Sequence, residues 1–334
     1  MDVQKEKIRT VIKGLYDIQK LRVATGNRIV ASLRPIEMAR IKSAMGEEAD
    51  PDKQQAEADK ILKKIAAEYN TLTDYLAKQQ KTKAVLNKHI EILGSELTYV
   101  KSRADYDLVE SYSFLLSAEK NFEDSVKREV EQHPLWDAFF AGVGGCGPLM
   151  AAVCIAYLDP YKARYPSSFW KYAGLDVVNV EGKDEGRQRW HVEDVQYEVD
   201  GEVRTKKGLT YNPFLKTKLV GVLGGSFLKA RGGSKYADIY YDYKRRLENR
   251  HEEDENVKRP VVIHRRATRY AVKQFLADLW VAWRTIENLP TGHPYAVDFL
   301  GRDEHHSPRN QPIGVTLAPA VSDINLDDIS ETDA

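Results

Sequence analysis

Apolar residues recur at helical spacing through the N-terminal part of the chain. Between residues 6 and 33 they fall three or four positions apart, which predicts an amphipathic helix. Pro35 predicts a break, because proline cannot donate the backbone hydrogen bond of a helix interior. A short second helix is expected after it, so residues 1–46 are predicted to form N-terminal helices. Residues 47–58 are polar and contain a proline, and we expect a flexible loop there.

The same periodicity returns between residues 59 and 134. Apolar stripes run through residues 61–76, 86–100 and 108–130. The polar stretch 78–83 between the first two predicts a kink or a helical hairpin. Apolar stripes with charged flanks are typical of coiled coils and helical bundles. We therefore predict a helical coiled-coil arm whose residues serve packing and dimerisation rather than catalysis.

A cluster of glycines precedes the most apolar segment of the chain. Pro148 and an apolar run through Leu158 follow it. Glycine permits tight turns and close backbone approach, and proline is favoured at the first helical position, so a turn into a helix N-terminus is predicted. Such an end attracts an anion, usually phosphate. The preceding segment is helical, which argues against a dinucleotide-binding βαβ unit. The turn contains Gly142, Gly144, Gly145 and Gly147.

A second local pattern predicts a β-hairpin. Val195, Tyr197 and Val199 alternate with polar residues, and Asp200-Gly201 follows as a two-residue turn. Just before this stretch, Trp190 and His191 stand side by side in the sequence. They either stack on a nucleic-acid base or, as such residues do more often, cap the apolar face of a small sheet.

The overall charge balance conceals a basic region. The chain has 50 basic and 50 acidic residues, but the basic ones concentrate between residues 204 and 273, around two predicted helix starts near Pro213 and Val261. Lysine and arginine bind a phosphate backbone with little sequence information. The alternative is an ordinary solvated helix surface; combined with the glycine turn, the cluster favours nucleic acid. The predicted DNA-contacting cations are Lys206, Lys207, Lys216, Lys218, Arg265, Arg266 and Arg269.

Composition excludes several other classes. The N-terminus is charged and lacks the apolar core of a signal peptide, and no apolar run is long enough to cross a bilayer. Cys146 and Cys154 form neither a CxxC pair nor a metal-ligand cluster, and His191 and His264 lack the neighbours of a zinc site. We expect a cytoplasmic protein without cofactor or metal. Residues 301–334 become acidic from Ser322 and are predicted to be a disordered tail.

The stretch from Gly142 to Leu175 resembles the C-terminal domain of the 110/116/902 group of insertion-sequence transposases. In that family a G-x-G-P turn leads into an alanine-rich helix, and a phenylalanine and a YAGL sequence follow. A weaker resemblance extends from Lys206 to Tyr295. The resemblance implies a transposase C-terminal-like DNA-binding domain over residues 135–300. The matching residues are Gly144, Gly147, Pro148, Ala151, Ala152, Phe169, Tyr172, Ala173, Gly174 and Leu175.

The chain departs from the family in two places. The family's N-terminal half is a RuvC-like nuclease with four acidic metal ligands, and no strand-like counterpart exists here. The family's nucleophilic serine precedes a glycine, whereas this chain has Glu181-Gly182 at that place. A carboxylate cannot replace an activated hydroxyl in strand rejoining. Whether the chain is an enzyme therefore stays open, and no catalytic residue is assigned.

These observations predict a mainly α protein. A long helical coiled-coil arm precedes a compact helical domain with a helix-hairpin-helix-like glycine turn and a small β-hairpin insertion. The expected function is transposase-like DNA binding in DNA transposition or recombination, without autonomous catalysis. The expected partners are DNA, a structured guide RNA, a second copy bound through the arm, and a separate nuclease subunit, in a nucleoid-associated setting. The alternatives are an active recombinase with a displaced nucleophile and a structural coiled-coil interaction protein.

Overall fold

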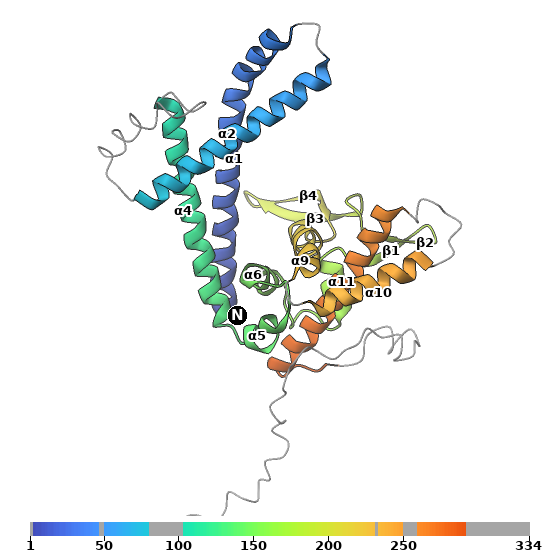
Figure 1. Ribbon diagram of the computed structural model, residues 1–334. Helices are drawn as coiled ribbons and strands as arrows, with labels where there is room; N and C mark the ends of the chain where they lie inside the picture. Colours follow the sequence, from blue (N-terminus) through green and yellow to red (C-terminus); the bar gives the residue numbers. More distant parts are fainter. Residues whose placement is uncertain (1–2, 47–49, 80–102, 231–232, 250–258, 292–334) are drawn as a thin grey trace, which may run out of the picture. The chain divides into compact units, whose positions relative to one another are not determined.

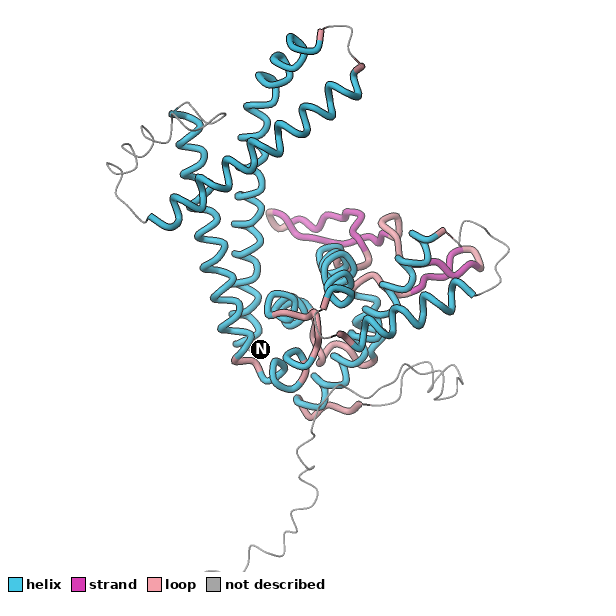
Figure 2. Tube along the Cα trace, viewed as in Figure 1, coloured by secondary structure: helices cyan, strands magenta, loops and turns pink. Residues whose placement is uncertain are grey.

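The chain divides into two compact units, which are described separately. The computed structural model describes residues 3–46, 50–79, 103–230, 233–249 and 259–291 (Figure 1). Residues 10–126 form one unit, called the arm unit here. Residues 1–9 and 127–334 form the other, called the C-terminal unit. Helices dominate both, and the strands of the described residues form only two hairpins (Figure 2), so the predicted mainly α class is confirmed.

The first helix, α1, runs without interruption from Val3 to Met45 and contains Pro35. The predicted break at Pro35 is therefore wrong. Ile29 and Ile41 are buried on either side of the proline, at 3% and 5% exposure, and their packing outweighs the lost backbone hydrogen bond. Gly46, with φ of 85°, ends the helix by donating its N–H to the carbonyl of Lys42.

The second helix, α2, spans Pro51–Gln79, so the predicted loop over residues 47–58 is wrong from residue 51 onward. Asp50 caps this helix: its side chain accepts the N–H of Asp52 at 3.0 Å, and its carbonyl accepts that of Lys53. Pro51 then occupies the first helical position, where its missing N–H has no cost. Most of the predicted kink at 78–83 lies outside the described residues.

In the arm unit, α1 packs antiparallel against α4, which spans Arg103–Glu131. Glu119, 5% exposed, accepts hydrogen bonds from Gln19 at 2.9 Å and from the guanidinium of Arg22. The same guanidinium donates to the hydroxyl of Tyr112 at 3.0 Å. Arg22 therefore contacts two residues that lie about two turns apart on α4. The predicted coiled-coil arm over residues 59–134 stays a prediction.

Replacing Glu119 with glutamine is expected to lower the free energy of unfolding at pH 7 by about 1–2 kcal/mol, because hydrogen bonds to a charged group are lost. Burial disfavours the charge of Glu119, yet the hydrogen bonds from Arg22 and Gln19 lower its pKa overall. Stability from a lowered pKa is present above the unfolded-state pKa and is lost as pH falls through the folded-state pKa. Urea unfolding followed by circular dichroism should show the gap between wild type and variant closing below about pH 4.

The matched control is Glu57→Gln, which breaks an exposed ion pair with Lys60 in the same unit. Its effect should be much smaller, because solvent screens exposed pairs. An equal effect of the two changes would contradict the role given to Glu119.

In the C-terminal unit, the glycine turn leads into a short buried helix. Gly147 is the N-cap of α6 and Pro148 its first residue; the helix ends at Tyr157, before Asp159-Pro160, as predicted. Every residue from Met150 to Ala156 is buried, because the small side chains let neighbouring segments approach on all sides. The elements of this region are, in order, α5 (Pro134–Ala138), the 3₁₀ turn η1 (Phe140–Gly142), α6 (Pro148–Tyr157) and α7 (Pro166–Tyr172).

Two antiparallel hairpins follow, and both central residues of each turn have a positive φ. Asp200 and Gly201, with φ of 55° and 80°, connect β3 and β4, so the predicted hairpin is confirmed. Glu181 and Gly182, with φ of 49° and 79°, connect a shorter hairpin that the sequence analysis missed. Positive φ at both central residues defines the two-residue turn that matches strand twist. The strands are β1 (Val177–Val180), β2 (Lys183–Gly186), β3 (Val192–Val199) and β4 (Glu202–Leu209).

The remaining helices surround α11, whose buried face supplies much of the core. Asn212 caps the helix that begins at Pro213, as predicted, by accepting the N–H of Leu215 at 3.0 Å. On α11, Phe275, Trp280 and Trp283 are buried, and α7, α9 and α10 pack around them. The elements are α8 (Pro213–Lys216), the π-helical segment η2 (Thr217–Leu223), α9 (Gly224–Lys229), α10 (Lys235–Asn249) and α11 (Pro260–Ile286).

Candidate nucleic-acid interface

The glycine turn is packed against the backbone of α9 and the segment that follows it. A Cβ atom on Gly145, whose φ is 89°, would lie 2.7 Å from the carbonyl oxygen of Ser226. A Cβ atom on Gly144 would overlap the carbonyl oxygen of Gly233. These two glycines are therefore required by packing. Gly142 and Gly147 are exposed. Phosphate binding at this turn stays a prediction.

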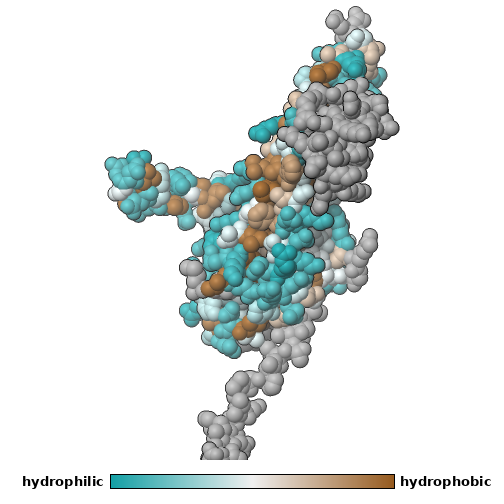
Figure 3. All heavy atoms as spheres, turned by 90° about the vertical axis from the view of Figure 1, so that its left-hand side faces the viewer, coloured by the Kyte–Doolittle hydropathy of each residue, from teal (hydrophilic) through white to brown (hydrophobic). Residues whose placement is uncertain are grey.

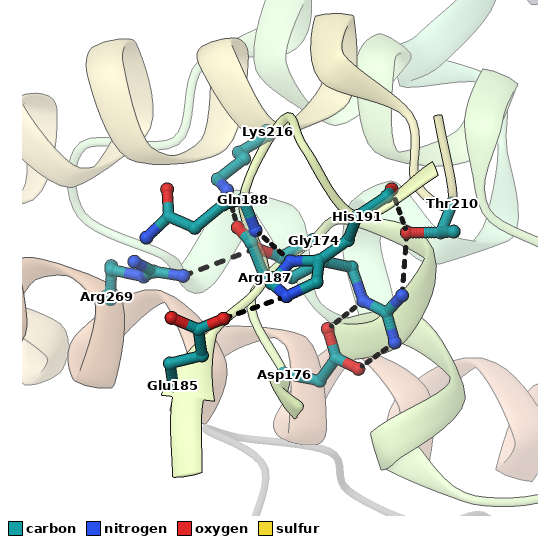
Figure 4. Close-up of polar contacts among 9 residues, drawn as sticks. All are labelled: Gly174, Asp176, Glu185, Arg187, Gln188, His191, Thr210, Lys216 and Arg269. Atoms are coloured by element: carbon teal, nitrogen blue, oxygen red, sulfur yellow. Dashed lines mark hydrogen bonds and ion pairs between the residues drawn. The ribbon is translucent and has the colours of Figure 1, made fainter. Parts of the chain in front are cut away.

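A cluster of cations lies beside the β1–β2 hairpin, together with the carboxylates of Asp176 and Glu185 (Figure 4). Arg187, just after β2, donates Nε and Nη2 to the two oxygens of Asp176, each at 2.8 Å. Its Nη1 donates to the hydroxyl of Thr210 at 2.6 Å. This bidentate pair closes the base of the hairpin and uses both oxygens of Asp176.

Two further cations meet this loop from other elements. Lys216, at the end of α8, donates its ammonium to the carbonyl of Arg187 at 2.8 Å. Arg269, on α11, donates to the carbonyl of Gly174 at 3.3 Å, and its guanidinium lies where a Cβ on Gly186 would be 3.1 Å away. Backbone carbonyls orient these charges without neutralising them.

The electrostatic environment of the cluster disfavours its positive charges. Burial, together with the nearby charges of Arg269, Arg187 and Arg189, lowers the pKa of Lys216 to about 8, although Asp176 opposes the change. Burial also lowers the pKa of Arg269, and burial and the charge of Arg269 lower that of Lys273. Groups of half-buried cations with such shifts are candidates for a functional site, because an anion would relieve their repulsion.

The basic face of α11 extends the cluster toward solvent. With 3.6 residues per turn, Arg265, Arg266, Arg269 and Lys273 fall within a sector of about 100°. Arg265 is exposed, and the other three are partly buried. The ammonium of Lys273 lies over the ring of Trp170, 4.9 Å from the ring centre. The predicted cations of α11 thus share one side of the helix with a cation that the prediction omitted.

The other predicted cations are more dispersed. On β4, Lys206 lies 4.7 Å from the ring of Tyr197, and Lys207, on the opposite face, forms an ion pair with Asp194 at 2.7 Å. Lys218 is partly buried, and burial lowers its pKa. Of the predicted set, the structure brings Lys216 into electrostatic contact with Arg269.

Hydrogen bonds to His191 fix the loop between the two hairpins. The N–H of Gln188 donates to Nδ1 at 2.7 Å, which leaves Nε2 as the donor to Glu185 at 3.0 Å. The hydroxyl of Thr210 donates to the backbone carbonyl of His191 at 3.1 Å. Trp190 is 57% exposed, and its ring lies against that of His191 in a tilted arrangement, with ring centres 3.7 Å apart and planes at 39°. More than half of Trp190 is open to solvent, and the choice between its two predicted roles stays a prediction.

Asp176 and Arg187 are the residues that sequence reasoning missed. Asp176 directly precedes β1 and Arg187 directly follows β2, so both lie at the base of the hairpin. There the N–H of Arg187 also donates to the carbonyl of Asp176. The local signal was weak: Gly182 suits the second position of a two-residue turn, but Glu181 is not of the type favoured at the first. These two residues form that turn and are exposed, so the position matched to the family's serine lies at a hairpin tip.

Other kinds of site find no support among the described residues. They contain no group of three His, Cys, Asp or Glu side chains placed to hold a metal ion. Cys146 and Cys154 are buried free thiols, and burial raises the pKa of both. None of the described helices is both long and apolar enough to cross a membrane. Comparisons with protein-family models, curated proteins and solved structures find no match to this chain.

Proposed function

We propose that the chain binds DNA through the basic cluster, in the manner expected of a transposase C-terminal domain, and does not cut DNA by itself. One observation supports this most: Lys216, Arg269 and Lys273 are partly buried cations from two elements, and the carboxylate of Asp176, whose charge acts on all three, is already paired with Arg187. Burial is the largest cause of the lowered pKa values of Lys216 and Lys273, and the charge of Arg269 lowers both further. A row of phosphates supplies the negative charge that the cluster lacks.

The arrangement favours contact with the phosphate backbone of DNA over recognition of its bases. Arg265 and Arg266 continue the basic face of α11 beyond the cluster, so successive phosphates of one strand would meet successive turns of the helix. Contacts of this kind position a protein on DNA without specifying sequence. Specificity would then come from a partner, and a structured guide RNA and a separate nuclease subunit are the partners we propose. Association with the nucleoid follows from DNA binding of this kind.

The arm unit supports self-association as a second part of the proposal. Leu21, Val23 and Phe114 are about half or more exposed on α1 and α4. Figure 3 faces the side on which α4 lies in Figure 1 and shows apolar patches among the polar surface. Exposed apolar side chains on a helical pair favour pairing with another copy. A dimer would place two basic clusters on one DNA.

The test is duplex DNA binding across a salt series between about 50 and 200 mM, for the whole chain. The double variant Arg269→Gln and Lys273→Gln is expected to bind about tenfold more weakly at low salt. Its log–log salt slope should be smaller by about 2, because two phosphate contacts are lost. Unfolding curves would confirm that the variant is folded.

The control removes the same charge from the arm unit, by Lys60→Gln and Lys63→Gln, and should bind like wild type. Equal losses in both variants would mean that charge alone, and not the cluster, determines binding. Absence of binding at low salt would refute the proposal and favour the structural coiled-coil alternative, which the exposed apolar residues of the arm also fit.

A further inference from the structure

We propose that Trp190 is a stacking platform for an unpaired nucleotide, so that the preferred ligand is a nucleic acid with an extruded or single-stranded base rather than a fully paired duplex. This inference rests on the proposed function and names the class of ligand. The platform consists of Trp190, His191 beneath it and the exposed Arg189 beside it.

The first support is the exposure of Trp190 on a loop that is otherwise anchored. A single exposed aromatic residue is ordinary on a protein surface. Here, however, the supporting ring of His191 has a side chain only 9% exposed and hydrogen bonds at both nitrogens. The ring of Trp190 lies against this fixed ring, tilted by 39°, while more than half of Trp190 faces solvent. An aromatic surface held in place in this way binds at a low entropic cost.

The second support is the connection of the platform to the cation cluster. The carbonyl of His191 accepts from Thr210, whose hydroxyl also accepts from the guanidinium of Arg187. Lys216 donates to the carbonyl of Arg187, three residues before Trp190. The charge of Arg189, which precedes Trp190, acts on Lys216. Figure 4 shows Gln188 and His191 beside Arg187, Lys216 and Arg269.

An aromatic face beside cations is the chemistry that recognises single-stranded nucleic acid. Bases stack on the aromatic ring, and the cations bind the adjoining phosphates. The bases of an intact duplex are stacked on one another, so Trp190 gains little from them. A nucleotide at a gap, bulge, branch or single strand offers a free face. DNA and RNA share this chemistry, and the test separates them.

The experiment compares two DNA probes with the whole chain at one low salt concentration. One is a fully paired duplex; the other is the same duplex with one unpaired 2-aminopurine, whose fluorescence is quenched on stacking. Wild type should bind the unpaired probe about 5- to 150-fold more tightly, the range that corresponds to roughly 1–3 kcal/mol per stacked base. The corresponding RNA probes show whether replacing deoxyribose with ribose changes the affinity.

The variants separate stacking from charge. Trp190→Leu should lose the preference and the quenching but bind the paired duplex like wild type, and Trp190→Phe should restore part of both. Tyr241→Leu changes another exposed aromatic residue, 51% exposed, and should have no effect. Equal binding of both probes by wild type, or an unchanged preference in Trp190→Leu, would overturn the inference while leaving duplex binding in place. Failure to bind any probe would overturn the proposed function as well.

Discussion

Changing Gly145 to alanine is expected to lower the free energy of unfolding of the C-terminal unit by about 2–5 kcal/mol. Two costs combine. The backbone has φ of 89°, which residues with a Cβ atom adopt only with strain, typically about 1–3 kcal/mol. The new Cβ would also lie 2.7–3.0 Å from three backbone atoms of Ser226 and Phe227, and forcing packed segments apart costs a further 1–3 kcal/mol or so.

Gly147 provides a control within the same turn. Its backbone is extended, with φ of −79°, and a Cβ atom there would meet nothing within 4 Å. Gly147→Ala should therefore change the unfolding free energy by less than about 1 kcal/mol. Urea unfolding of both variants measures the contrast. Equal stability of the two would contradict the packing role of Gly145.

The same pair of variants tests the predicted phosphate site. Gly147 is exposed at the N-terminus of α6, so an added methyl group would obstruct an approaching phosphate without disturbing the fold. Weaker DNA binding by Gly147→Ala at unchanged stability would support contact between the turn and a phosphate. Unchanged binding would leave packing on α9 as the whole reason for the glycines. The variant thus separates two explanations that the glycine pattern alone does not distinguish.

Local signals predicted the elements whose causes are local. Asn212-Pro213 and Gly147-Pro148 mark helix starts because capping depends on neighbouring residues. Asp200-Gly201 marks a hairpin because the turn type requires its backbone angles. Pro35 misled the prediction because the packing of buried side chains on either side of it, Ile29 and Ile41 among them, keeps the helix intact. That packing is a property of the folded arm and not of the residues next to the proline.

The candidate site depends mainly on contacts between residues distant in sequence. A basic composition was visible, but nothing local showed that Lys216 and Arg269, 53 residues apart, would approach the same loop. The role of Asp176 required knowing that β1 and β2 pair and so bring Arg187 opposite it. Charge clusters of this kind follow from topology, whereas the separate basic residues are apparent from sequence.

Duplex DNA binding is expected to weaken about tenfold between pH 7 and pH 9, because Lys216 loses its proton in the free protein. Burial and the charges of Arg269, Arg187 and Arg189 place its pKa at about 8 there, with Asp176 acting in the opposite direction. A phosphate beside the ammonium would return the pKa toward the ordinary value near 10.5. Binding above pH 8 must then include proton uptake.

The sign follows from the two pKa values. Well below pH 8 the ammonium is charged in both states, and its contact with phosphate contributes fully to affinity. As pH rises above the pKa of the free protein, more of the binding energy is used to protonate Lys216, and the affinity falls by up to tenfold per pH unit. Lys273, whose pKa is lowered too, acts in the same direction.

The measurement is DNA affinity from pH 6 to pH 9 at constant ionic strength, because screening must not vary. Lys216→Arg keeps the positive charge throughout this range and should bind with a much flatter profile. Lys60→Gln, in the arm unit, should keep the wild-type profile. Identical profiles for wild type and Lys216→Arg would show that Lys216 does not approach a phosphate, and the DNA-contacting face would then have to lie elsewhere, with Arg265 and Arg266 at the start of α11 as the next residues to test.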